Sequence, residues 1–279
     1  MPTIFLFLLI YGIPFVTVFA TSLYDYRIYP NRFNFVGFQN YVHMFFGDTT
    51  FMKALVNTLI WIFLHCTLHI ALGVAIALLL SRKPFGWKFV RTIYMIPNII
   101  SSAAVGIIAL NFYNPEYGLI NSVIRAIGFR EFSYNWLFNE ATAFGALTLT
   151  WIIYAAYTTV LVLAEISAIP EELFEAARID GASRFKIDMQ IILPLLRNII
   201  GTTVIMAATY MLQMFDRIYL TTRGGPANAT LNLPLYLYKT ALVENNYGYA
   251  NTIGAFIIVV GIFTMILISQ LFRIGKMYS

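Results

Sequence analysis

Long apolar runs separated by short charged segments dominate the pattern along this chain. With Asp, Glu, Lys and Arg taken as breaks, six runs come near or exceed the roughly 20 residues that a helix needs to cross a bilayer. The fifth run is uncharged over 198–215, and we extend it to Leu220 past Asp216 and Arg217. A charge at mid-membrane costs roughly 2.5–3.5 kcal/mol, so this pair must lie near an interface or face a wet cavity. The predicted spanning helices are 2–24, 54–81, 92–115, 141–164, 198–220 and 245–272.

The composition also indicates a polytopic α-helical membrane protein. Of the 279 residues, 59% are hydrophobic and 11% are charged, whereas a soluble domain has about 25% charged residues. The runs are too long and too continuously apolar for barrel strands, which alternate over about ten residues. No Lys or Arg precedes the first run, so we interpret it as a span and keep a cleaved leader as the lesser alternative. The net charge of +5 comes from scattered residues without a dense patch, so no nucleic-acid partner is expected.

The loop charges predict the orientation of the chain in the membrane. The segment 81–91, SRKPFGWKFVR, is short and has four basic residues and no acidic one, which is typical of a cytoplasmic loop. The N-terminus, 165–197 and the C-terminal tail are then cytoplasmic, while 25–53, 116–140 and 216–244 lie outside. The aromatic, Asn-rich outer segments suit half-buried interfacial helices.

One compact charged segment, 169–194, lies between the fourth and fifth spans. Pro170 suits the start of a helix, and Glu171 and Glu172 complement the positive end of its dipole. Gly181 stands where the helix C-terminus needs a residue that tolerates left-handed φ. A second helix over 182–192 follows, and Pro194 marks re-entry toward the membrane. The segment is therefore a helix–Gly–helix elbow, either a solvated loop or a surface that docks into a partner's groove.

The motifs in this elbow resemble those of a known family. The residues EAA at 175–177, Gly181 and I-x-L-P at 191–194 resemble the EAA motif of membrane permease subunits of bacterial ABC importers. Other stretches resemble the carbohydrate-uptake branch, and within it the first of two permease subunits for maltose, oligosaccharides or glycerol-3-phosphate. These stretches are FVGFQNY (35–41), NPEYGLIN (114–121), IPEELFEAARIDGA (169–182), MFDRIYLTTRGGP (214–226) and YGYANT (247–252).

The resemblance implies a single permease domain over 1–279 with a type I ABC importer fold in the bacterial inner membrane. It implies a second homologous permease, two ATPase subunits, an extracytoplasmic solute-binding protein and a sugar substrate, with alternating access as the mechanism. ATP and Mg²⁺ then belong to the ATPase, in keeping with the lack of a phosphate-binding G-x-x-x-x-G-K-[ST] sequence here. Glu175 would pair with a basic residue of the ATPase, the two alanines would allow close approach, and Gly181 would make the turn. The implied coupling residues are Glu175, Ala176, Ala177, Asp180, Gly181, Leu193 and Pro194.

Polar and aromatic residues inside the spans are the candidates for a substrate pathway, because unneeded polarity there is costly. Aromatic faces suit the C–H surfaces of a sugar, and hydroxyl or amide groups suit its hydroxyls. Interhelical hydrogen bonding or interfacial anchoring is the alternative for each residue. Met211 and Met214 stand where the maltose-type subunit is Asn-rich, which argues against maltose itself. The candidates from residue chemistry and resemblance together are Thr150, Tyr154, Tyr157, Tyr210, Met211, Gln213 and Met214.

Two other function classes stay open from the residues alone. An ion-coupled secondary transporter working alone predicts an inverted repeat and intramembrane carboxylates, yet Glu165 and Asp216 lie only at span ends. A membrane enzyme needs a clustered catalytic constellation, and only His65 and His69 come close. These two histidines share a helix face, but no third metal ligand accompanies them, so we expect interhelical hydrogen bonds and no metal site.

Overall fold

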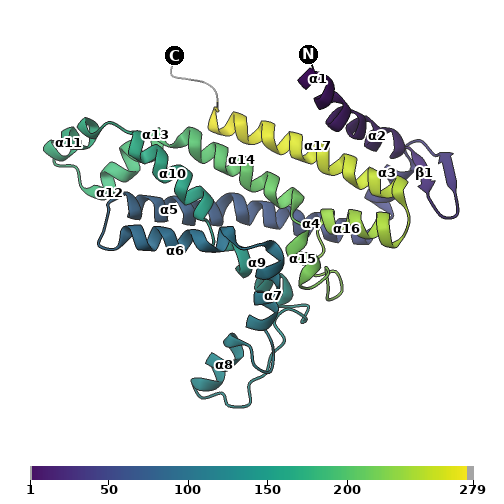
Figure 1. Cartoon of the computed structure of the whole chain (residues 1–279), viewed down its shortest axis with the longest axis horizontal. Coiled ribbons are helices and arrows are strands. Elements are labelled where there is room, and N and C mark those ends of the chain that lie inside the picture. The colour runs from purple at the N-terminus through teal and green to yellow at the C-terminus, as the bar shows by residue number, and fades with distance from the viewer. Residues whose placement is uncertain (1, 275–279) are drawn as a thin grey trace.

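The computed structural model describes residues 2–274, and Figure 1 shows its long helices lying side by side as a bundle. Four long apolar helical segments and two bent helix pairs could cross a membrane, which gives up to six spans in the described part of the chain. The fold class is therefore all-α and polytopic, apart from one small hairpin. The four long segments are α1 (Pro2–Phe7), η1 (Leu8–Gly12) and α2 (Ile13–Thr21); α4 (Thr49–Leu64), η2 (His65–His69) and α5 (Ile70–Ser81); α9 (Ala143–Ile152) with α10 (Ala156–Ala168); and α17 (Tyr247–Phe272).

The third predicted span, 92–115, is not one straight helix. It contains α6 (Trp87–Ile99) and α7 (Ser102–Phe112), which meet at 99°. Pro97 removes one backbone donor from the last turn of α6. Ser101 is extended, with ψ 147°, and its hydroxyl accepts the backbone N–H of Ala104 at 3.3 Å, which starts a new helix. The continuous helix expected over these residues is therefore broken, and its two parts count as one span only as a bent pair.

The fifth predicted span, 198–220, is also divided. It contains α14 (Arg197–Gln213) and the separate α15 (Asp216–Leu220), with Met214 extended between them. The Met214 carbonyl accepts a 2.6 Å hydrogen bond from the Asn232 side chain, so this backbone acceptor has a partner at the break. Before α14, the helical segment 184–195 bends by 69° at Leu196, two residues beyond the predicted re-entry point at Pro194.

The elbow and the predicted cytoplasmic loop lie at the same end of the bundle, and the outer segments 25–53 and 233–243 lie at the other (Figure 1). This agrees with the predicted grouping of these segments. The elbow contains α11 (Glu171–Ile179), α12 (Arg184–Ile187), η3 (Asp188–Ile192) and α13 (Leu193–Leu195). The other segments contain β1 (Tyr24–Arg27), β2 (Arg32–Phe35), α3 (Gln39–Phe46), α8 (Leu119–Ala126), α16 (Leu233–Tyr238) and η4 (Lys239–Val243).

The expected short outer helices are present, but β1 and β2 form an antiparallel hairpin that the pattern did not suggest. The helical part of the first span ends at Thr21, where the prediction continued to Tyr24. The end of the predicted 1–279 domain, with the tail beyond Ile274, lies outside the described residues.

Asp48 fastens three helices together at the end opposite the elbow. It caps α4 by accepting the Phe51 backbone N–H at 2.9 Å, and it also accepts the hydroxyls of Tyr236 on α16 and Tyr249 on α17. Burial favours the neutral acid, but these hydrogen bonds outweigh burial and hold the pKa of Asp48 below its ordinary value of 3.8. The ionised carboxylate is thus the form that stabilises this junction.

Two buried clusters hold the bundle. The larger one joins α4, α9, α14, α16 and α17 around Trp61, Trp151 and Met211. The smaller one lies at the elbow end and joins α5 and α10 to the elbow through Ala77, Val162 and other residues. The elbow is therefore packed on two spans and does not hang free in solvent. The helical segment Pro2–Thr21 has no buried residue. It therefore presents apolar side chains to lipid or to a neighbouring subunit.

Candidate functional site

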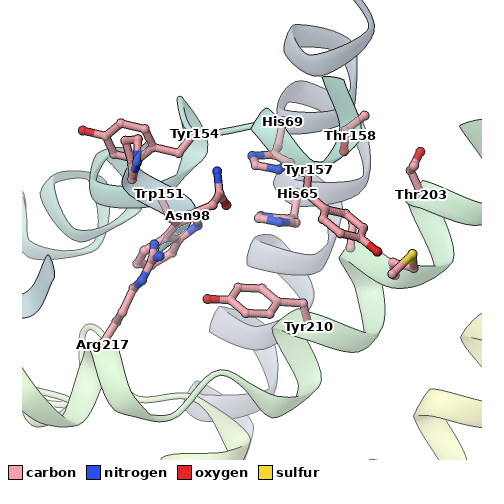
Figure 2. Close-up of a pocket in the computed structure, with 13 residues that line it drawn as sticks. His65, His69, Asn98, Trp151, Tyr154, Tyr157, Thr158, Thr203, Tyr210 and Arg217 are labelled. Carbon is pink, nitrogen blue, oxygen red and sulfur yellow. The ribbon is translucent and has the colours of Figure 1, made fainter. Parts of the chain in front are cut away.

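A cavity of about 380 Å³ opens among the second to fifth predicted spans and α15 (Figure 2). Its walls come from η2, α6, α9, α10, α14 and α15, with Tyr154 from the segment between α9 and α10. Three predicted pathway residues line it, Tyr154, Tyr157 and Tyr210. Tyr157 is 56% exposed and Tyr210 is 42% exposed, so both rings are accessible to a molecule in the cavity. Aromatic rings in a concave site suit the C–H faces of a sugar.

The other four predicted pathway residues do not line this cavity. Thr150 donates its hydroxyl to the Leu147 carbonyl of its own helix at 2.7 Å. Met211 and Met214 are 1% and 4% exposed, because their side chains pack in the larger cluster. Gln213 is exposed at the end of α14, away from the cavity walls. Beyond the break the chain returns to the cavity wall at Arg217 on the separate helix α15, and a helical pattern continued past Gln213 misses this change.

The break in the fourth span is held by side chains from other helices. Tyr94 on α6 donates its hydroxyl to the Ile153 carbonyl at 2.8 Å and accepts the Ala155 N–H at 2.9 Å. The Ile152 carbonyl lies 3.0 Å from Nδ1 of His69. These contacts satisfy backbone groups that a broken helix would otherwise leave unpaired in the membrane. The break therefore positions Tyr154 at the cavity without leaving its neighbours' polar backbone groups free.

Two buried histidines form one wall of the cavity. The π-helical turn η2 stacks the rings of His65 and His69, with centroids 3.9 Å apart and planes at 16°. His69 makes the interhelical contact to Ile152 that we expected. Nδ1 of His65, however, is buried without a hydrogen-bond partner. Within residues 2–274 no group of three or more His, Cys, Asp or Glu residues could hold a metal ion.

Arg217 brings a positive charge to the same cavity. It extends from α15, which packs against α7. Figure 2 shows its side chain reaching toward Trp151 and Asn98, while the hydroxyl of Tyr210 points to the same side. The sequence identified Arg217 as a costly charge within an apolar region. It did not predict that Arg217 shares a cavity with the two histidines, because this placement depends on the separate helix α15. The i, i+4 spacing of the histidines was the one local signal for this wall.

The elbow turns through a Schellman motif at the end of α11. The Ala182 N–H donates to the Ala177 carbonyl at 2.9 Å, and the Gly181 N–H donates to the Arg178 carbonyl at 3.1 Å. Gly181 has φ +74°, and no heavy atom lies within 4 Å of where a Cβ would be. Ser183 then caps α12 by accepting the Lys186 N–H at 3.3 Å. The predicted helix–Gly–helix turn is confirmed, and its requirement for glycine is a matter of backbone conformation alone.

The predicted coupling residues divide between the outer and inner sides of the elbow. Glu175, Ala176, Asp180 and Pro194 are exposed, and Leu193 is partly buried. Ala177 is 8% exposed and packs in the elbow-end cluster of this chain, so it cannot offer a shallow face to a partner as expected. Beside the exposed acids, Ile179 is 86% exposed and Phe185 is 71% exposed.

An ion pair fixes the elbow to the loop between the second and third spans. Arg82 follows α5, and its guanidinium donates to the carboxylate of Asp188 at the start of η3. Asp188 is 7% exposed, so the contact is largely sheltered from solvent. The elbow therefore has an exposed outer side and a clamped inner side.

The chain resembles known proteins along nearly its whole length. Residues 69–274 match a family described as "Binding-protein-dependent transport system inner membrane component". Probable ABC transporter permease protein YurN of Bacillus subtilis is 30% identical, over 97% of this chain and 93% of that protein. Diacetylchitobiose uptake system permease protein NgcF of Streptomyces coelicolor is 33% identical, over 98% of this chain and 79% of that protein. A chain of the crystal structure of a bacterial alginate ABC transporter, in complex with an alginate pentasaccharide-bound periplasmic protein, superposes with a TM-score of 0.85 at 24% identity, covering 98% of this chain and 91% of that one.

Proposed function

Since this chain belongs to the family of binding-protein-dependent transport system inner membrane components, we propose that it is one permease subunit of an ATP-driven importer of oligosaccharides in a bacterial cytoplasmic membrane. The chain is a multi-pass transport subunit, and the family resemblance in its motifs is confirmed. The relatives named above include uptake proteins for diacetylchitobiose and alginate. This supports a saccharide of more than one unit as the substrate class.

The exposed side of the elbow is the observation that carries the coupling part of the proposal. Ile179 and Phe185 are large apolar residues at the end of the bundle, where charged neighbours keep the segment out of lipid. An exposed apolar surface rimmed by charge is typical of a docking site. We assign this surface to a separate ATPase subunit, with Glu175 available to a basic residue of that subunit.

The proposal also includes the other partners that the family resemblance implies. Two ATPase subunits bind ATP and Mg²⁺, and one of them receives this elbow. A second, homologous permease completes the pathway beside this chain. A solute-binding protein delivers the saccharide at the end opposite the elbow, and the saccharide reaches the tyrosine-lined cavity. Closure of the ATPases moves the elbow and biases the bundle between two states that open to opposite sides.

Reconstitution tests the proposal directly. The chain is co-expressed with its neighbouring permease, ATPase and binding protein, and the complex is placed in proteoliposomes. We expect ATP turnover to rise when saccharide-loaded binding protein is added, and saccharide to accumulate only with ATP. Uptake by this chain alone, driven by an ion gradient, would contradict the proposal and favour a secondary transporter.

A charge reversal at the elbow tests the docking surface separately. Glu175→Lys should lower the amount of ATPase that co-purifies with the permease pair, while binding-protein docking is unchanged. Glu131→Lys makes the same charge change at an exposed position in the segment predicted to lie outside, and it should leave ATPase association intact. Equal ATPase recovery with both variants would refute the assignment of the elbow to the ATPase.

A further inference from the structure

Arg217 is a half-buried cation, and it has no ion-pair partner among residues 2–274. Its Nε and Nη1 atoms are shielded from solvent and have no hydrogen-bond partner. The side chain lines the cavity described above, on the side of Trp151 and Asn98 (Figure 2). Desolvated, unpaired N–H groups of a cation are costly, and more so in a membrane, unless an anion meets them there.

Nothing in the cavity wall supplies that anion. The wall contains Arg217, His65 and His69, together with neutral polar and aromatic residues, but no Asp or Glu. Asp216 neighbours Arg217 in sequence but is exposed, and no ion pair of Arg217 occurs among residues 2–274. The charge is therefore directed at the space where the substrate passes.

The neighbouring groups suit an acidic ligand as well. A guanidinium presents parallel N–H groups that match the two oxygens of a carboxylate, phosphate or sulfate. Asn98 and the hydroxyl of Tyr210 lie toward the same side of the cavity and can bond the sugar hydroxyls (Figure 2). Tyr154 and Tyr157 add ring surface to the wall of the same cavity.

We propose that Arg217 makes this cavity selective for saccharides that carry an acidic group, a carboxylate, a phosphate or a sulfate ester. The inference rests on the proposed transport function and narrows its substrate class. Arg217 contacts the acidic group, and the aromatic rings contact the sugar ring. A neutral saccharide of the same length leaves the guanidinium unpaired and therefore binds less tightly.

Direct binding to the complete transporter tests this selectivity without the binding protein. The nucleotide-free complex of both permeases and both ATPases is placed in lipid nanodiscs. Equilibrium dialysis then compares maltotriose with trigalacturonate, a phosphorylated maltotriose and a sulfated maltotriose. We expect at least one acidic probe to bind about tenfold or more tightly than maltotriose, and the three acidic arms identify which group fits. Equal or tighter binding of maltotriose, or no binding by any acidic probe, overturns the inference.

Variants at Arg217 test whether this residue is responsible. Arg217→Gln should weaken binding of the acidic probe about 10- to 100-fold, the range for a lost charge-assisted hydrogen bond, and leave maltotriose binding within twofold. Arg217→Lys keeps the charge but loses the paired N–H groups, so its effect should be intermediate. Arg223→Gln is the matched control, because Arg223 is exposed, stacks over Tyr219 at 5.9 Å and does not line the cavity. Unchanged binding of the acidic probe to Arg217→Gln refutes the assignment.

Two further measurements separate the alternatives. If Arg217 instead pairs with a carboxylate of the second permease, Arg217→Gln reduces co-purification of the two permeases and weakens both probe classes equally, which overturns the inference. ATP-driven uptake of neutral saccharides alone overturns the inference and leaves the proposed function standing. Absence of ATP-driven uptake for every saccharide contradicts the proposed function. The inference about Arg217 still stands in that case if the complex binds acidic saccharides selectively and Arg217→Gln loses this binding.

Discussion

Gly181 allows the contribution of the elbow's shape to be tested apart from its contacts. Its φ of +74° is left-handed, and a side chain there meets no atom within 4 Å. Gly181→Val therefore adds no clash and only the backbone cost of a β-branched residue in this conformation, about 1–3 kcal/mol. At about 2 kcal/mol, the ratio of molecules that keep the present turn to molecules with a rearranged turn falls roughly 30-fold. We expect saccharide uptake to fall by up to that factor while membrane insertion is retained.

Gly86 provides a matched control for this substitution. It has φ +77°, lies in the loop at the same end of the bundle, and likewise has no heavy atom within 4 Å of where a Cβ would be. Gly86→Val should therefore carry about the same backbone cost. It is outside the elbow, so uptake should stay near that of the wild type.

The assay compares ATP-dependent uptake in proteoliposomes with equal amounts of each complex, and co-purification of the ATPase reports docking. Normal uptake in Gly181→Val, or equal loss in both valine variants, would show that the shape of this turn does not govern coupling.

Three further predictions concern the packing that supports the cavity and the opposite end of the bundle. Tyr94→Phe removes both hydrogen bonds at the fourth-span break and should lower the unfolding free energy by about 1–2 kcal/mol. Tyr117→Phe loses one exposed hydrogen bond and should change the unfolding free energy little. Thermal unfolding in detergent measures both variants. Gly73→Ala places a Cβ 2.7 Å from a side-chain carbon of α10 and should lower the unfolding free energy by about 1–3 kcal/mol, because it forces α5 and α10 apart. Gly145→Ala has open space around its Cβ, so the same measurement should show an unchanged or higher unfolding free energy. Because the pKa of Asp48 is lowered in the folded protein, the stabilisation by its carboxylate is present above about pH 4 and is lost as the pH falls through the folded pKa. Asp48→Asn should therefore lower the midpoint of thermal unfolding at pH 7 and make that midpoint fall less steeply in acid. An unchanged midpoint at pH 7 would contradict this.

Local sequence signals predicted the features that depend on local chemistry. The apolar runs located the long helices, because a spanning helix must be apolar over its whole length. The glycine at 181 located the elbow, because its Schellman hydrogen bonds are all made within five residues.

The breaks in the spans could not be predicted from the same signals. The gap between α9 and α10 is held by Tyr94 and His69, which are separated from it by 59 to 83 residues in sequence. A side chain that satisfies a distant backbone group leaves no periodic pattern in either segment. Met211 shows the same limit, because its side chain is buried by residues of helices that are distant in sequence.

The helix α10 connects the cavity to the elbow. Its 13 residues rise about 20 Å from the break at 153–155 to Pro170 at the elbow. Thr159 donates to the Gly73 carbonyl at 3.1 Å, and Gly73 has no room for a side chain against α10, so α5 and α10 move together. The Arg82–Asp188 ion pair ties the elbow to the end of that pair. A force applied to the elbow therefore reaches the break, where the helix is already interrupted and its backbone groups are bonded elsewhere. If an ATPase moves the elbow as proposed, rotation at this break would shift Tyr154 relative to the other cavity walls without unfolding a helix, as alternating access requires.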